Sequence, residues 1–142
     1  MISFQVVFRD DWLMRMVEQI AAVIAKITGL SRNKDYGAAL AEAEKGWDIL
    51  GVPRDLVAVL DGPTLAELLA TPEKMRAAAD LLIAEAVALT GKGDPIHAAI
   101  CYRRGFELYL EARAIAPLPS DDETLRGLSR HVPAHLVDPR YR

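Results

Sequence analysis

Cysteine is nearly absent from this sequence: Cys101 is the only one among 142 residues. One cysteine cannot form a disulfide within the chain, which excludes the class of small secreted domains that disulfides hold together. An excess of charge of one sign is also lacking, because the formal net charge is −3 and Lys and Arg are scattered. A nucleic-acid-binding surface is therefore disfavoured.

Long apolar runs are missing as well. No charge-free stretch approaches the roughly 20 residues that a membrane span needs. The start of the chain has no basic leader, and Asp10 and Asp11 interrupt its apolar residues. Since 51% of the residues are nevertheless hydrophobic, disorder is disfavoured. We expect one soluble cytoplasmic domain over residues 1–142, with no membrane contact.

The motifs of the common cofactor-dependent and hydrolytic enzymes are absent. The sequence has no glycine-rich phosphate loop after a strand, no Ser–His–Asp constellation and no metalloprotease helix. The glycine-rich "TGKGD" at residues 90–94 joins two predicted helices, so we interpret it as a turn. No cofactor and no metal are expected.

Four long segments have the periodicity of amphipathic helices, and they predict an all-α fold. Gly29 is expected to end the first helix and Gly51 the second, while Asp35 and Asp94 are expected to cap the second and the fourth. Short turns join the helices in pairs, which predicts two antiparallel hairpins over residues 11–51 and 71–116.

Shorter elements fill the rest of the chain. The sequence of residues 54–70 predicts an insertion of two short helices, with the break between them at Gly62. Residues 120–142 predict a short helix, opened by a capping box of Ser120 and Glu123, and then an extended tail. The leading "ISFQVVF" alternates as a strand does. It either packs on the first helix as an extension or is a strand completed by another chain.

The second helices of the two hairpins repeat a pattern, "KDYGAALAEAEKG" and "GDPIHAAICYRRG". Small residues seven positions apart lie on one stripe of a helix and allow a neighbouring helix to approach closely. An aromatic side chain lies on the same stripe of the second copy. The predicted packing residues are Ala39, Gly46, Ala98, Tyr102 and Gly105.

This pattern resembles the second helix of the tetratricopeptide repeat. Two departures are clear: Ala43 stands where an aromatic residue is usual, and Pro95 where tyrosine is usual. The copies are also 59 residues apart (Ala39 to Ala98), against about 34 in that family. The chain is similar, too, to a small bacterial family of repeat-like proteins of unestablished function. The resemblance implies stacked hairpins and a non-enzymatic interaction or scaffold module that binds a protein or peptide.

Histidine and cysteine supply the alternative hypothesis, a small hydrolase or thiol enzyme. His97 and Cys101 are four residues apart on one helix face, as a base and a thiol nucleophile could be. Cys101 also belongs to the stripe of small residues, which favours an inert packing role. His131 and His135 have ligand-like spacing, but no third ligand completes a zinc set.

Charged residues follow Cys101 on the same predicted helix. A ladder of opposite charges favours a solvated helix face, with one side of a peptide groove as the alternative; it consists of Arg103, Arg104, Glu107 and Glu111. The acidic run from Asp121 to Glu123 is typical of the first turn of a helix, and a cation site is the less favoured interpretation.

The first predicted helix carries more apolar surface than one neighbour covers. Its apolar arc spans about 200° at 100° per residue, against the roughly 100° of an ordinary surface helix. The excess meets either the rest of the chain or a second copy. Because an exposed apolar face usually marks an interface, we predict a homodimer built around Leu13, Met16, Ile20 and Ile24.

Overall fold

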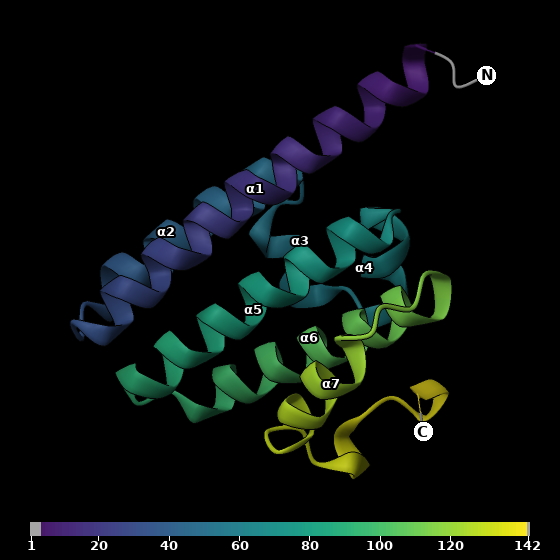
Figure 1. The fold of residues 1–142 in the computed structure, drawn as a ribbon. Helices are drawn as coiled ribbons and strands as arrows, with labels where there is room; N and C mark the ends of the chain where they lie inside the picture. The colour runs from purple at the N-terminus through teal and green to yellow at the C-terminus, as the bar shows by residue number, and fades with distance from the viewer. Residues whose placement is uncertain (1–3, 142) are drawn as a thin grey trace.

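The structure, a computed structural model, describes residues 4–141, and over these residues it is all-α, without a strand (Figure 1). The prediction of fold class is thus confirmed. Within the described chain, no helix has both the length and the hydropathy that crossing a membrane requires. The α-helices are α1 (Phe4–Arg32), α2 (Tyr36–Leu50), α3 (Arg54–Val59), α4 (Gly62–Leu69), α5 (Pro72–Lys92), α6 (Pro95–Ile115) and α7 (Asp121–Ser129).

The helices pack as two antiparallel pairs, α1 with α2 and α5 with α6 (Figure 1). Helix α5 also packs along both α1 and α2, so the second pair stacks on the first through this one helix. The short helices α3 and α4 connect the pairs, with α4 lying on α6, and α7 packs against the end of α6. Helix α5 is therefore the centre of the molecule.

Short side chains make this central position possible. Six alanines of α5 are buried, because helices approach it from several sides. Gly46 of α2 and Gly105 of α6 both face α5: a Cβ on Gly46 would lie 2.7 Å from Leu81 Cδ2, and one on Gly105 3.3 Å from the Ala79 carbonyl oxygen. The alanines are Ala77, Ala78, Ala79, Ala84, Ala86 and Ala88.

The expected helix ends at Gly51 and Asp94 are where the sequence indicated, and Gly93 lies in the predicted turn at residues 90–94. Gly51 and Gly93 close α2 and α5 in the left-handed conformation, with φ of 75° and 90°. The Asp94 side chain caps α6 by accepting the N–H of His97 at 3.3 Å. Asp35 occupies the N-cap of α2, but its side chain makes no capping hydrogen bond.

The predicted end of the first helix was wrong, because α1 runs through Gly29 to Arg32. Glycine inside a helix costs about 1 kcal/mol relative to alanine. The additional turn brings Leu30 against the core, which offsets that cost. Lys34 takes the left-handed conformation instead, with φ of 61°, and the N–H of Asp35 closes the helix on the Leu30 carbonyl at 2.9 Å.

The predicted extended leader was also wrong over the residues that the structure describes. Phe4 to Phe8 form the first turns of α1, and these turns reach beyond the ends of the neighbouring helices (Figure 1). The first two residues of the predicted strand, Ile2 and Ser3, lie outside the described part. A short apolar run fits either period, and no strand among residues 4–141 is available to pair with it.

The C-terminal segment differs from expectation in two details. Ser120 makes no capping hydrogen bond to α7; the Asp121 carboxylate instead accepts the N–H of Leu118 at 2.8 Å. The tail is interrupted by two 3-10 turns, Ala134–Leu136 and Pro139–Tyr141. It folds back because Val132 and Val137 are buried, as apolar side chains favour.

The charge ladder on α6 is not a solvated face. Glu107 is buried beneath α4, where a Cβ on Gly62 would lie 3.1 Å from the Glu107 Cβ. Arg104 donates to Glu107 at 3.1 Å, and burial raises the pKa of the Glu107 carboxyl. The inserted helix α4 thus covers the face of α6 that carries Glu107. The sequence of α6 alone does not predict this burial.

Candidate interaction groove

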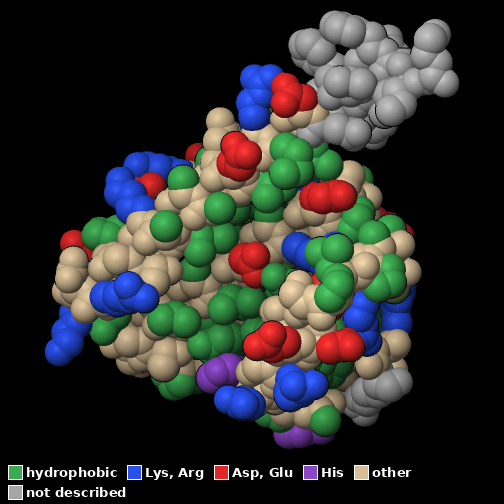
Figure 2. All heavy atoms as spheres, viewed as in Figure 1, with side chains coloured by type: hydrophobic (Ala, Val, Ile, Leu, Met, Phe, Trp, Pro, Cys, Tyr) green, Lys and Arg blue, Asp and Glu red, His purple; other side chains and the backbone are tan. Residues whose placement is uncertain are grey.

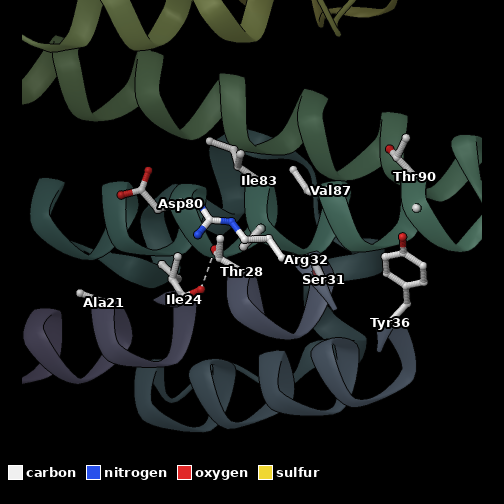
Figure 3. Close-up of a pocket in the computed structure, with 12 residues that line it drawn as sticks. Ala21, Ile24, Thr28, Ser31, Arg32, Tyr36, Asp80, Ile83, Val87 and Thr90 are labelled. Carbon is white, nitrogen blue, oxygen red and sulfur yellow. Dashed lines mark hydrogen bonds between the residues drawn. The ribbon is translucent and has the colours of Figure 1, made fainter. Parts of the chain in front are cut away.

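A groove of about 750 Å³ runs between α1 and α5, the two helices that the stacking of the hairpins brings together. It has apolar walls, with Ile24 on α1 facing Ile83 and Val87 on α5 (Figure 3). Figure 2 shows hydrophobic side chains gathered along this hollow. We call it the α1–α5 groove.

The groove continues toward the start of both helices. A second hollow, lined by Met14, Val17 and Ala77 among others, shares Ala21, Ile24 and Asp80 with the first. From Met14 to Arg32 the floor of α1 is about 27 Å long at 1.5 Å per residue. That length suits a helix or a short extended segment lying along it.

Asp80 lies in the wall of the groove, at the junction of the two hollows. One carboxylate oxygen accepts a hydrogen bond from the Tyr109 hydroxyl of α6. Although the side chain opens to the groove, the surrounding apolar walls raise the pKa of Asp80, and the hydrogen bond from Tyr109 only partly offsets this. Among the residues that the structure describes, no cation pairs with Asp80.

Arg32 lies near the far end of the groove. Figure 3 shows its side chain extending along the groove, on the same side of the ribbon as Asp80. No ion pair to Arg32 occurs within residues 4–141. Beside it, Tyr36 fits against Gly91, where a Cβ would come within 2.5 Å of the ring carbon Cζ. The groove therefore carries two opposite charges that have no ionic partner among the described residues, on walls that are mostly apolar.

An ion pair fixes the opposite end. Arg76 on α5 donates to both oxygens of Asp121, at 3.0 and 2.7 Å, and to the Ala116 carbonyl at 2.7 Å. These hydrogen bonds from Arg76, with that from the Leu118 N–H, lower the pKa of Asp121 despite its burial. The start of α7 is thereby fastened to α5.

The four residues predicted at a dimer interface differ in their exposure in the structure. Met16 and Ile20 are buried between α1 and the other helices of the same chain, so they are not accessible in the folded monomer. Leu13 and Ile24 are half-buried, and Ile24 lines the α1–α5 groove. Among residues 11–32 of α1, the exposed large apolar side chains are Trp12 and Met14.

The five predicted packing residues lie on the inner stripes of α2 and α6. Ala39, Gly46, Ala98 and Gly105 are buried, as the seven-residue spacing indicates. Tyr102 is half-buried and stacks on the ring of His131, with the ring centroids 4.2 Å apart. That contact holds the C-terminal segment against α6.

His97 and Cys101 both line a cavity on the other side of α5 from the groove. In the part of the chain that the structure describes, no hydrogen bond joins these two side chains. His97 Nδ1 is 2.7 Å from the Asp94 carboxylate. Burial, aided by the negative charge of Glu85, raises the pKa of the Cys101 thiol to about 12. This environment favours the thiol over the nucleophilic thiolate.

Sequence reasoning did not single out Asp80, Arg32, Arg54 or Glu85 as functional residues. A signal was present for Asp80 and Glu85, because both interrupt apolar faces of the third long helix. No group of three or more metal-ligating side chains occurs among the described residues. Comparisons with protein-family models, curated proteins and solved structures find no match to this chain.

Proposed function

We propose that the protein is a non-enzymatic interaction module, built from two stacked tetratricopeptide-like hairpins, and that the α1–α5 groove is its contact surface. The packing of α5 on both α1 and α2 supports the stacking, since each unit of a helical array covers its neighbour. Such arrays offer elongated surfaces to other proteins.

The observation that carries the proposal is the pair of opposite charges in the groove. Arg32 and Asp80 line the groove, and neither has an ionic partner in the part of the chain that the structure describes. Removing such charges from water is costly unless each meets an opposite charge. A ligand that fills this groove therefore needs a complementary acid and base at matching positions.

A second copy of the chain meets this requirement. If two grooves face each other about a two-fold axis with their helices antiparallel, Arg32 of each copy approaches Asp80 of the partner subunit. Such an isologous contact forms every pair twice.

Charge exchange tests this arrangement directly. Arg32→Asp places two acids opposite each other, and Asp80→Arg places two bases, so each variant alone is expected to be monomeric. An equimolar mixture restores both attractive pairs and is expected to form a heterodimer. Light scattering at micromolar concentration should give about twice the chain mass for the wild type and for the mixture. A monomeric wild type, or a mixture that stays monomeric, contradicts the homodimer.

An apolar substitution with a matched control tests the surface itself. Ile24 lines the groove, while Ala25 next to it is exposed and outside it. Ile24→Glu should weaken dimerisation at least about tenfold, because it buries a charge, and Ala25→Glu should not. If the protein is monomeric and the groove instead takes a peptide from another protein, the module would remain and the homodimer would be wrong.

A further inference from the structure

A second cavity, of about 460 Å³, lies between α2, α3, α5 and α6, on the other side of α5 from the groove. This volume falls in the range of small-molecule sites, roughly 300–1,000 Å³. Much of its wall is aliphatic, and its polar groups include Arg54 and Glu85. The aliphatic residues are Leu40, Val57, Leu82, Leu89 and Ile100.

Glu85 is an unusual residue for this place, because only 5% of its side chain is exposed. Its Oε1 accepts from Trp47 Nε1 at 3.2 Å and from Arg54 Nε at 3.3 Å. Its Oε2 is buried and has no hydrogen-bond partner within residues 4–141. An unsatisfied buried oxygen costs about 1–3 kcal/mol, so Glu85 retains capacity for one more polar partner.

Arg54, the first residue of α3, is one of two arginines that line this cavity; the other, Arg104, is bonded to the buried Glu107. The Arg54 side chain is 33% exposed, and its contacts are long: 3.3 Å from Nε to Glu85 and 3.9 Å from Nη2 to Cys101 Sγ. A guanidinium has five N–H donors in a planar fork that fits a carboxylate bidentately. Arg54 can therefore accept a second carboxylate while it remains near Glu85.

We propose that this cavity binds a small aliphatic carboxylic acid, with the carboxylate on Arg54 and the chain along the aliphatic wall. Two carboxyl groups then share one guanidinium, and a proton taken up from solvent is held between them. Glu85 Oε2, which otherwise has no partner, bonds to the ligand through this proton. No covalent step is involved. The proposal is independent of dimerisation, because the groove and the cavity share no lining residue.

Octanoate is a suitable probe, with octanol and octylamine as controls of equal chain length. Calorimetry should show that octanoate binds at least about tenfold more tightly than octanol, as a charge-assisted bond predicts, and that octylamine is weaker still. Titrations in buffers of different ionisation enthalpy should show proton uptake with octanoate alone. Equal affinities for all three, or no binding at millimolar concentration, would overturn the proposal.

Variants locate the site. Arg54→Met keeps the apolar stem, so octanoate and octanol should then bind equally. Ala58→Trp should fill the mouth of the cavity and weaken both, whereas Val59→Trp, one residue along and outside the cavity, should weaken neither. If Arg54→Met does not fold, the comparison of Ala58→Trp with Val59→Trp still tests the location of the site. Octanoate binding that persists unchanged in Ala58→Trp contradicts this location.

Trp47 reports the binding without a label. With Trp12→Phe, Trp47 becomes the only tryptophan, and its indole N–H bonds to Glu85. When the ligand draws Glu85 toward itself, that bond changes, so the Trp47 emission should shift with octanoate and not with octanol. A shift of equal size with both would indicate apolar filling alone and would contradict the role of Glu85.

Discussion

Glu85 illustrates how one buried side chain makes stability depend on pH. Burial raises the pKa of its carboxyl above the ordinary 4.5, and the nearby Arg54 only partly offsets this. The folded chain then holds the proton more tightly than the unfolded chain. The stabilising contribution of this site is therefore complete below pH 4.5 and is lost as the pH rises through the folded pKa.

Glu85→Gln cannot ionise, so it lacks this loss. Relative to the wild type, the variant should gain free energy of unfolding as the pH rises from 4 toward neutral, whatever its constant offset at acid pH. Urea denaturation of both proteins across this range measures the difference. A difference that does not change with pH would show that Glu85 titrates alike in the folded and unfolded chains.

Lys34 adopts a strained backbone conformation in the turn that closes α1. A non-glycine residue at φ of 61° costs about 1 kcal/mol or more relative to glycine. Lys34→Gly should therefore stabilise the protein by about 1 kcal/mol, and Gly51→Ala, at φ of 75°, should destabilise it by a similar amount. Urea midpoints of the two variants should move in opposite directions. Midpoints that move together would contradict the backbone argument.

At the scale of the helix, two glycines of α2 separate propensity from packing. Gly37 has no neighbour within 4 Å of an added Cβ, whereas Gly46 faces Leu81 at 2.7 Å. Gly37→Ala should stabilise by about 0.5–1 kcal/mol through helix propensity. Gly46→Ala should destabilise by about 1–3 kcal/mol, because it pushes α2 away from α5. Thermal unfolding of both variants tests this, and a stabilising Gly46→Ala would be inconsistent with the close approach.

A buried ion pair joins the start of α7 to α5, in addition to the buried Leu125 and Leu128 of α7. Asp121 is 1% exposed and bonds to Arg76 through two oxygens. Asp121→Asn should cost about 3 kcal/mol at neutral pH, because it leaves the Arg76 charge without a partner. Since the pKa of Asp121 is lowered, the wild-type contribution is present above pH 3.8 and is lost as the pH falls through the folded pKa.

Chemical denaturation at neutral pH measures that cost, and hydrogen exchange locates it. Faster exchange should be confined to α7 and the segment after it. Asp122→Asn is the matched control, since its partner Arg113 is 43% exposed and the pair adds less than about 1 kcal/mol. Equal effects of the two variants would contradict a special role for Asp121.

Periodicity predicted the long helices because each carries its apolar stripe in its own sequence. Gly51 and Gly93 were recognisable as helix ends for the same local reason. Gly29 led to a wrong prediction of the end of α1. The stabilisation from burying Leu30 is a tertiary effect, and the local sequence pattern does not show it. The burial of Glu107 was likewise hidden, because it depends on α4 lying across α6.

The candidate surfaces were harder to predict than the helices. Ile24 was expected at an interface, and it lines the α1–α5 groove. Met16 and Ile20 lie on the same apolar arc, but the facing helices bury them. The groove joins α1 to α5, and the cavity joins residues as distant as Arg54 and Cys101. Helical periodicity predicts on which face of its helix each residue lies. It does not predict which other helix packs against that face.

At the scale of the whole molecule, the central position of α5 decides how the chain can be divided. The first hairpin buries its inner stripe against a helix that belongs to the second. A fragment ending at Asp61 would thus lose the surface that covers Ile20 and Trp47, whereas a fragment from Gly62 keeps the local pairing of α5 with α6. Fragments 1–61 and 62–142 should therefore complement each other: circular dichroism should show more helix for the mixture than for the sum of the two. The unit of folding is then the entire chain, even though its sequence repeats.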